Sequence, residues 1–153
     1  MDALDREILS ILQHNGRATM TEIAAQVGLS LTACHRRFRE LESAGVILGF
    51  HAELDFDKLG RSFRALVFVT MDSSEHGSMT AFEEAIAAVP EVVQAQRLFG
   101  SPDYQLSIAT TSMQAYQELY DSVLSQLPGV HRMQSTLVMK SVVAPRAPLG
   151  FSA

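Results

Sequence analysis

Hydrophobic and polar positions follow two different periods along this chain, and the change comes near residue 45. Over residues 3–43 the apolar side chains recur every three or four positions, the period of an amphipathic α-helix. From residue 46 onward, segments with alternating apolar and polar residues are interspersed with helical ones. The pattern therefore predicts a helical N-terminal part followed by a part that mixes strands and helices.

The first part predicts three helices, and capping signals bound each of them. We expect these helices at residues 3–14, 19–28 and 30–45. The second opens with TMTE, a capping box in which Thr19 and Glu22 each satisfy a backbone N–H group of the other. Ser30 caps the third helix, and the turn before it contains Gly28. Two helices joined by a short glycine turn, with another helix packed before them, form a tri-helical helix-turn-helix.

The third helix divides into two faces. A core stripe is predicted from spacings of three and four residues: Leu31, Cys34, Phe38 and Leu41. The opposite side, called the polar face below, consists of Thr32, His35, Arg36 and Arg39. An arginine there can pair bidentately with guanine in the major groove or hold a phosphate. Arg37 lies on the flank, where we expect it to reach Glu40 or a phosphate.

The charge of the chain bears on this interpretation. The formal net charge is −5, and residues 1–50 hold five Arg against six acidic residues, a net −1. Residues 51–153 hold seven basic and eleven acidic residues, a net −4, so most of the acidity lies in the second part. Neither part is the strongly basic block of a non-specific nucleic-acid binder. A solvated basic helix face is the simpler alternative. The arginines, however, concentrate on the second helix of the glycine-turn pair, and this position favours DNA binding.

The remainder of the chain predicts a layered α and β domain. Residues 46–54 alternate and predict a linker strand leading away from the helices, and residues 55–60 predict a turn or short helix. Beyond them we expect strands at 61–71, 92–100, 104–110 and 130–143, with helices at 79–89 and 112–127. The order β-α-β-β-α-β is that of ferredoxin-like folds, with both helices on one face of the sheet.

The other face of this sheet needs a cover, because its candidate residues are apolar. These candidates are Phe63, Phe68, Val93, Ile108 and the strand from Met133 to Met139. A second copy of the sheet is the simplest cover, which predicts a homodimer. The fold class is therefore α+β: an N-terminal tri-helical helix-turn-helix domain, a linker strand, and a C-terminal ferredoxin-like βαββαβ domain.

Several classes of chemistry are disfavoured. Cys34 is the only cysteine, and the five histidines show no HExxH-type spacing, so we expect no metal site. No activated-nucleophile motif or phosphate loop is present, so we do not expect an enzyme. No apolar run approaches the roughly 18 residues that span a bilayer, and no signal segment opens the chain. These observations predict a cytoplasmic protein without a membrane partner.

Several blocks of the sequence, in order, resemble the leucine-responsive/asparagine regulator (Lrp/AsnC) family of bacterial and archaeal transcription regulators. The N-terminal blocks are LDREILSILQHNGR, TEIAAQVGLS, RRFRELESAGVI and GFHAELD, followed by Leu59-Gly60. The C-terminal blocks are GSPDY at 100–104 and LPGV at 127–130. The resemblance covers about residues 2–143.

This resemblance implies a sequence-specific regulator that binds double-stranded DNA in a prokaryotic cytoplasm. It implies dimers joined sheet to sheet, commonly assembled into octamers or similar rings, and a small-molecule effector, typically an amino acid, in the cleft between neighbouring dimers. No other cofactor is implied. The implied domains are 1–46 (helix-turn-helix, DNA-binding), 47–60 (linker strand and turn), 61–143 (ferredoxin-like, dimerisation and effector) and 144–153 (C-terminal tail).

The resemblance also assigns residues. The DNA-binding set is Ser30, Thr32, His35, Arg36, Arg37 and Arg39. The effector loop is Gly100, Ser101, Pro102, Asp103 and Tyr104, with Thr136 as a weaker candidate from the last strand.

The effector loop has two interpretations on its own residues. Asp103 can pair with an α-ammonium group while nearby backbone N–H groups take an α-carboxylate. A G-x-P-D sequence is equally a good hairpin turn that needs no ligand. An alternative from another class is a ferredoxin-like metabolite-binding module or small enzyme without DNA binding, with Asp103 and Tyr104 as an acid/base pair and His131 as a third candidate.

Overall fold

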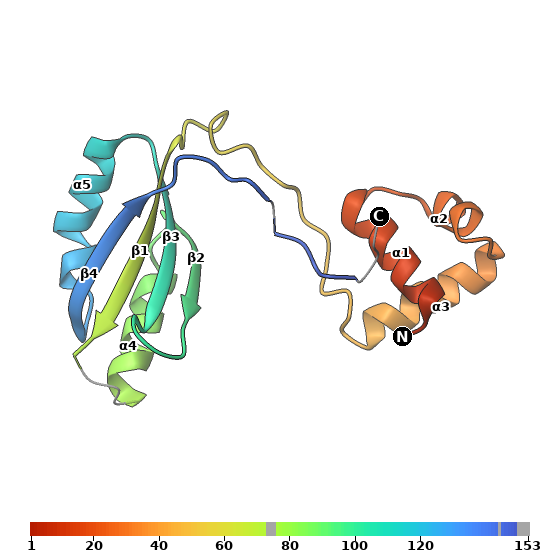
Figure 1. Cartoon of the computed structure of the whole chain (residues 1–153), viewed down its shortest axis with the longest axis horizontal. Helices are drawn as coiled ribbons and strands as arrows, with labels where there is room; N and C mark the ends of the chain where they lie inside the picture. The colour runs from red at the N-terminus through yellow and green to blue at the C-terminus, as the bar shows by residue number, and fades with distance from the viewer. Residues whose placement is uncertain (73–75, 144, 150–153) are drawn as a thin grey trace. The chain divides into compact units, whose positions relative to one another are not determined.

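The structure, a computed structural model, describes residues 1–72, 76–143 and 145–149 (Figure 1). The chain forms two compact units. One consists of Met1–Ala52 together with the C-terminal segment from Val143 onward, and the other consists of Glu53–Val142.

The first unit contains the three expected helices. They are α1 (Ala3–His14), α2 (Met20–Gln26) and α3 (Leu31–Ser43). The Thr19 hydroxyl accepts from the Glu22 N–H at 3.3 Å, and the Glu22 carboxylate accepts from the Thr19 N–H at 2.7 Å, which confirms the capping box. That backbone hydrogen bond lowers the pKa of the Glu22 carboxyl below its usual range. Gly28 lies in the turn between α2 and α3. Its φ of 69° is a left-handed conformation that glycine adopts without strain.

The core of the first unit lies among these helices. Its buried residues are Ile8, Leu12, Ile23, Ala24, Val27, Cys34 and Leu41. Burial raises the pKa of the Cys34 thiol, which agrees with its prediction as a small core hydrophobe. Leu31 was expected in the same stripe, but 47% of its surface is exposed. Helical side chains lean toward the N-terminus, so the side chain of this first residue of α3 projects beyond the stripe.

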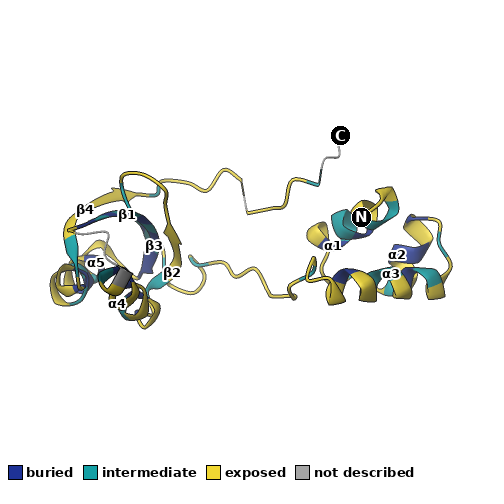
Figure 2. Cartoon of the chain, turned by 90° about the horizontal axis from the view of Figure 1, so that it is seen from below, coloured by how far each residue is buried: buried dark blue, intermediate teal, exposed yellow. Residues whose placement is uncertain are grey.

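The second unit contains a four-stranded antiparallel sheet in the order β2-β3-β1-β4. Its elements are β1 (Phe63–Met71), α4 (His76–Ala87), β2 (Val92–Arg97), β3 (Tyr104–Thr110), α5 (Met113–Ser122), the 3-10 turn η1 (Leu124–Gln126) and β4 (Val130–Leu137). Both α-helices lie against one face of the sheet, as Figure 2 shows. The predicted βαββαβ order is confirmed, although β4 ends six residues earlier than the pattern suggested.

The core of the second unit fills the space between the sheet and its helices. Burial alternates along β1, with Ala65, Val67 and Val69 pointing inward. Phe63 and Ile108 also lie on this inner side, so their assignment to the opposite face was wrong. The Phe63 ring lies 5.5 Å from that of Tyr116 on α5, and Ile108 is 1% exposed. Met133 pairs with the inward-facing Val69 and shares its side.

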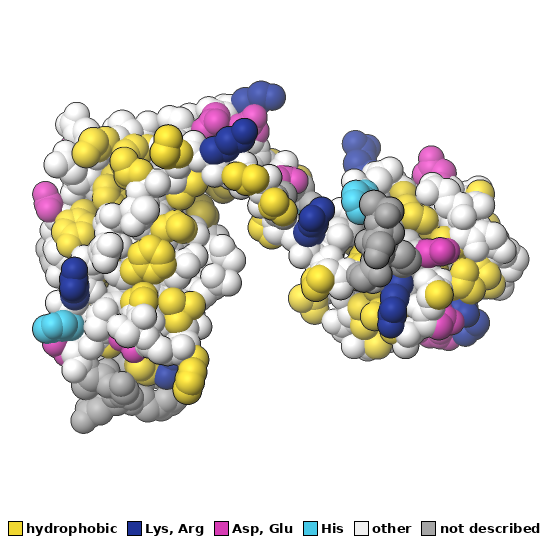
Figure 3. Space-filling model, in the orientation of Figure 1, with side chains coloured by type: hydrophobic (Ala, Val, Ile, Leu, Met, Phe, Trp, Pro, Cys, Tyr) yellow, Lys and Arg dark blue, Asp and Glu magenta, His cyan; other side chains and the backbone are white. Residues whose placement is uncertain are grey.

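The opposite, open face of the sheet is more polar than expected. Phe68 lies there as predicted, next to Leu66 on the same strand, because residues two apart along a strand share a face. Their neighbours in register on the adjacent strands are polar: Gln105, Ser107, Gln134 and Thr136, with Gln94 of β2 paired to Ser107. Figure 3 views this face and shows a group of hydrophobic side chains over the middle of the sheet. The open face is thus a small apolar centre within a polar frame.

The expected strand at 46–54 has no sheet pairing. Leu48 is 95% and Leu54 60% exposed, and a strand forms only where a neighbour takes its backbone hydrogen bonds. The turn at 56–60 is present and ends at Gly60 with a φ of 71°. In the tail, the Ala147 N–H donates to Gln13 Oε1 of α1 at 2.6 Å, while Ala144 and residues 150–153 lie outside the described residues.

The capping box gives the first testable prediction. Thr19→Ala removes the hydroxyl acceptor at the start of α2, so we expect the free energy of unfolding to fall by about 1 kcal/mol. Urea unfolding followed by helical circular dichroism measures this. Thr21→Ala, at an exposed position inside the same helix, is the matched control, and an equal loss in both variants would contradict the capping role.

Candidate nucleic-acid interface and effector loop

The polar face of α3 forms a shallow hollow on the surface. Its lining consists of Thr32, His35, Arg36, Arg39, Glu40 and Ser43. All four residues that the sequence assigned to the polar face therefore lie together. Glu40 and Ser43 were missed, although each stands four residues after an arginine of the face, a spacing that brings helical side chains together.

Ser30 lies at the beginning of this helix and does not line the hollow. Its hydroxyl oxygen accepts from the Ala33 N–H at 3.3 Å, so it acts as the N-cap of α3. The side chain is exposed at the end of the helix that carries a partial positive charge.

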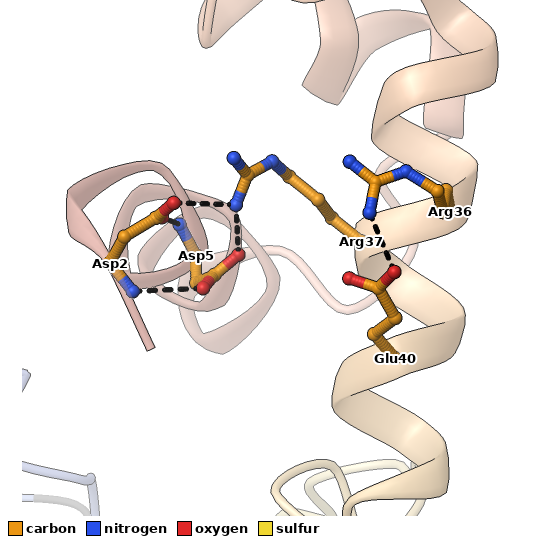
Figure 4. A network of polar contacts seen from close by, with 5 residues as sticks. All are labelled: Asp2, Asp5, Arg36, Arg37 and Glu40. Atoms are coloured by element: carbon orange, nitrogen blue, oxygen red, sulfur yellow. Dashed lines mark hydrogen bonds and ion pairs between the residues drawn. The ribbon is translucent and has the colours of Figure 1, made fainter.

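Arg37 has a different environment from the other arginines of α3. Its Nη1 donates to Asp5 Oδ1 at 2.7 Å and to Asp2 Oδ2 at 2.8 Å, both at the start of α1 (Figure 4). Only 20% of the Arg37 side chain is exposed. The expectation that Arg37 reaches Glu40 was wrong, because about 100° of helical rotation separates it from Arg36 and turns it toward α1.

Titration reflects this arrangement. The hydrogen bond to Asp5, and then that to Asp2, raises the pKa of the Arg37 guanidinium. The pKa of the Asp2 carboxyl is lowered from 3.8, first by the Asp5 N–H and then by the Arg37 side chain. Asp2 also caps α1, so the same carboxylate serves the helix end and the contact with α3.

Arg36 instead forms an ion pair within α3. Its Nη1 lies 2.6 Å from Glu40 Oε1, and the two side chains are 62% and 59% exposed (Figure 4). Arg39, also exposed, forms no ion pair among the described residues. The hollow thus contains one paired and one unpaired guanidinium.

The effector loop joins β2 to β3, and its backbone is well anchored. The Leu98 N–H donates to the Asp103 carbonyl at 2.7 Å, and the Asp103 N–H donates to the Val69 carbonyl at 2.9 Å. The Asp103 carboxylate accepts, through Oδ2, from the Met71 N–H at 2.8 Å. Asp103 therefore ties the loop to the end of β1, which supports the hairpin-turn interpretation. Its Oδ1 has no hydrogen-bond partner among the described residues.

Tyr104 does not belong to the exposed surface of the loop. It is 2% exposed, its ring lies 4.7 Å from that of Phe82, and its hydroxyl donates to Glu83 Oε1 at 2.7 Å. Burial, and then Glu83, raises the pKa of Tyr104 to about 12. The Asp103 carboxylate contacts the Met71 N–H and the Tyr104 hydroxyl contacts Glu83, so the two side chains have different surroundings. The remaining loop residues differ: Gly100 and Ser101 are exposed, and Pro102 is half-buried.

The hydrogen-bond partners of Asp103, Tyr104 and His131 do not favour the acid/base alternative. The His131 imidazole Nδ1 lies 2.9 Å from Asp72 Oδ1. The three residues of that hypothesis thus have three separate sets of partners: Met71 for Asp103, Glu83 for Tyr104 and Asp72 for His131.

Thr136 lies away from the loop within one chain. It is exposed on β4, opposite Leu66 on β1, whereas Asp103 contacts Met71. Five residues of strand separate Leu66 from Met71, about 16 Å. A site that uses both Asp103 and Thr136 needs them from different copies.

No group of three or more His, Cys, Asp or Glu among the described residues is arranged to hold a metal ion. No helix in the described part of the chain is long and apolar enough to cross a membrane.

Comparisons with known proteins agree with the two-unit organisation. Residues 64–148 match the Lrp/AsnC ligand binding domain, and residues 1–47 match the winged helix-turn-helix DNA-binding family. The Bkd operon transcriptional regulator of Pseudomonas aeruginosa is 34% identical over 148 residues, which cover 97% of each chain. The leucine-responsive regulatory protein of Haemophilus influenzae is 33% identical, over 93% of this chain and 86% of the relative.

A solved structure is similar over almost the same length. It is a transcriptional regulator from Neisseria meningitidis in complex with L-Met, with a TM-score of 0.88 and 30% identity, covering 94% of this chain and 93% of the other. These relatives are transcription regulators and not enzymes. The resemblance in the sequence is thereby confirmed, and the chain belongs to the Lrp/AsnC family of transcription regulators, with an N-terminal helix-turn-helix DNA-binding domain and a C-terminal ligand-binding domain.

Proposed function

We propose that this regulator recognises its operator through the polar face of α3 and responds to an amino acid at the effector loop. The observation that carries the DNA-binding part is the hollow of α3, in which Thr32, His35, Arg36 and Arg39 are gathered on one exposed side. The opposite side of the same helix is held in the core by Cys34 and Leu41. A helix fixed along its back presents its front side chains to the major groove in a defined orientation.

The residue types suit different parts of DNA. An arginine fork matches guanine O6 and N7, and it also pairs with phosphate oxygens. Thr32 lies in the first turn of α3, the end at which recognition helices contact base edges. Ser30 and the free N–H groups beside it form a helix N-terminus, which favours a phosphate. Arg37 has its fork occupied by two carboxylates, so we assign it to the positioning of α3 and not to base contacts.

Assembly into dimers follows from the small number of DNA contacts per copy. The chain has a formal net charge of −5, and its polar face holds two arginines, so one copy binds a polyanion weakly. Two recognition helices about 34 Å apart engage successive major grooves on one side of DNA, and linking them adds avidity. Leu66 and Phe68 on the open sheet face support sheet-to-sheet dimerisation. The octamer or similar ring is an expectation from the family resemblance.

The effector is proposed to be an amino acid bound between copies. The Neisseria meningitidis regulator was solved with L-Met, and the matched family is a ligand-binding domain. In this chain Asp103 Oδ1 is the available acceptor for an α-ammonium group, with Gly100 and Ser101 exposed beside it. Thr136 contributes from a neighbouring copy. The ligand acts through its different affinities for the assembly states of the protein. Regulation of prokaryotic DNA places this activity in the cytoplasm.

Operator binding tests the polar face. Arg36→Ala is expected to weaken binding by about 1–3 kcal/mol if Arg36 contacts a base. Gel-shift titration with the region upstream of the protein's own gene measures the loss. Arg6→Ala, an exposed arginine on α1, removes the same charge and is the control. An unchanged affinity for the Arg36 variant rejects its assignment.

The positioning role of Arg37 gives a pH-dependent prediction. A lowered pKa of Asp2 means that the stabilisation from its ionised form is complete above 3.8 and is lost as the pH falls below that value. Arg37→Ala is expected to lower the unfolding temperature at neutral pH and to reduce this acid sensitivity, because part of the shift comes from Arg37. Thermal unfolding between pH 2 and 7 measures both effects. Arg39→Ala is the control, and identical pH profiles for Arg37→Ala and the unchanged protein would refute the role.

The effector loop is tested by ligand-induced stabilisation. In a thermal-shift panel of the twenty amino acids, we expect at least one to raise the unfolding temperature, since a ligand that binds only the folded protein stabilises it. Asp103→Asn is expected to abolish that shift, because it removes the charge and keeps an oxygen for the Met71 N–H. Asp121→Asn on exposed helix surface is the control. No shift with any amino acid, or a full shift in the Asp103 variant, argues against this site.

A further inference from the structure

Glu40 places a carboxylate on the surface that the proposed function turns toward a polyanion. It lines the hollow of α3 together with Arg36 and Arg39, and 59% of its side chain is exposed. A negative charge at this position repels DNA phosphates, so its presence needs a physical reason.

Helix stability does not supply that reason. Glu40 lies in the last turn of α3, which ends at Ser43, where the helix dipole disfavours a negative charge. The pair also has its arginine at position i and its glutamate at i+4, the less favourable order on a helix. Exposed ion pairs contribute little to stability in any case. The fold of the first unit therefore gains almost nothing from this carboxylate.

The contact between the two side chains supplies a functional reason. Glu40 Oε1 lies 2.6 Å from Nη1 of Arg36, as Figure 4 shows, and so occupies one corner of the guanidinium. A guanidinium has five N–H donors in a rigid planar fork, which leaves Nη2 and Nε for other acceptors. A phosphate that approaches this fork meets the nearby carboxylate and is repelled. The O6 and N7 acceptors of guanine carry no net charge, so the nearby carboxylate weakens their binding to the guanidinium far less.

We propose that Glu40 is a specificity-determining residue: it positions the Arg36 guanidinium for a base edge and keeps that guanidinium from binding phosphates indiscriminately. The proposal rests on the polar face of α3 being the DNA-binding surface. Arg39 then has the complementary role. It lacks an ion pair among the described residues and lies in the same hollow, so it is free to hold a phosphate.

The test compares Glu40→Gln with Glu42→Gln. Both variants lose one negative charge from the same helix, and Glu42 is exposed and forms no ion pair among the residues that the structure describes. For each protein, fluorescence anisotropy gives the affinity for two duplexes of equal length. One is the duplex that the unchanged protein selects best from a random library, and the other is a scrambled sequence.

Glu40→Gln is expected to bind the scrambled duplex more tightly and to lower the ratio of selected to scrambled affinity about tenfold, within the range that one bidentate base contact discriminates. Glu42→Gln is expected to raise both affinities by one common factor and to leave the ratio unchanged. An equal ratio in Glu40→Gln and the unchanged protein overturns the proposal.

The Arg36→Ala background shows whether Glu40 acts through Arg36. In that background, Glu40→Gln is expected to leave the affinity ratio unchanged, and a further tenfold fall would overturn the positioning role. Failure of the proposed function looks different. An unchanged protein that selects no duplex from the library counts against the polar face itself and removes the basis of this proposal. Normal selection together with an inert Glu40 variant counts against Glu40 alone.

Discussion

The contact of α3 with α1 is the constraint on which the proposed DNA recognition by α3 depends. A recognition helix is useful only if its back is fixed, and here Cys34 and Leu41 are buried while Arg37 is bound by Asp2 and Asp5. The two carboxylates come from the first turn of α1, where they also form a capping box. One group of charges therefore defines where α1 begins and how α3 is held against it.

The three arginines of α3 have different partners because they point in different directions. Arg37 faces inward to the carboxylates of α1, and Arg36 shares the outer surface with Glu40. Arg39 remains without an ion pair among the described residues. Residues of the same type and within four positions of each other thus have three environments, since each step along a helix turns the side chain by about 100°.

Much of the fold follows from local signals in the sequence. The caps at Thr19 and Ser30, together with glycine stops, are short-range features, and they predicted the helices of the first unit closely. The alternation of the strands predicted the βαββαβ order. Sorting residues between the two sheet faces was less successful for Phe63 and Ile108, because hydrophobicity alone does not say which parity of a strand faces the helices.

The site was predictable to a different degree at each place. The polar face of α3 follows from helical periodicity, so the sequence was sufficient for its four residues. The partners of Arg37 were not accessible in this way, because they are more than thirty positions distant in the chain. The burial of Tyr104 was not predicted, because a loop motif does not show which of its residues packs against a helix. The segment at 46–54 alternates like a strand, but pairing depends on a neighbour that local sequence does not specify.

The hydrogen bond between Asp103 and the end of β1 has a consequence for how this loop can respond to a ligand. Oδ2 is engaged with the Met71 N–H, whereas Oδ1 is available. A cation that binds Oδ1 leaves the bond to Met71 intact and so need not disturb the strand. The carboxylate is already oriented before any ligand arrives, which reduces the entropy lost on binding. In the proposed effector site, one carboxylate oxygen of Asp103 would support the strand end and the other would bind the ligand.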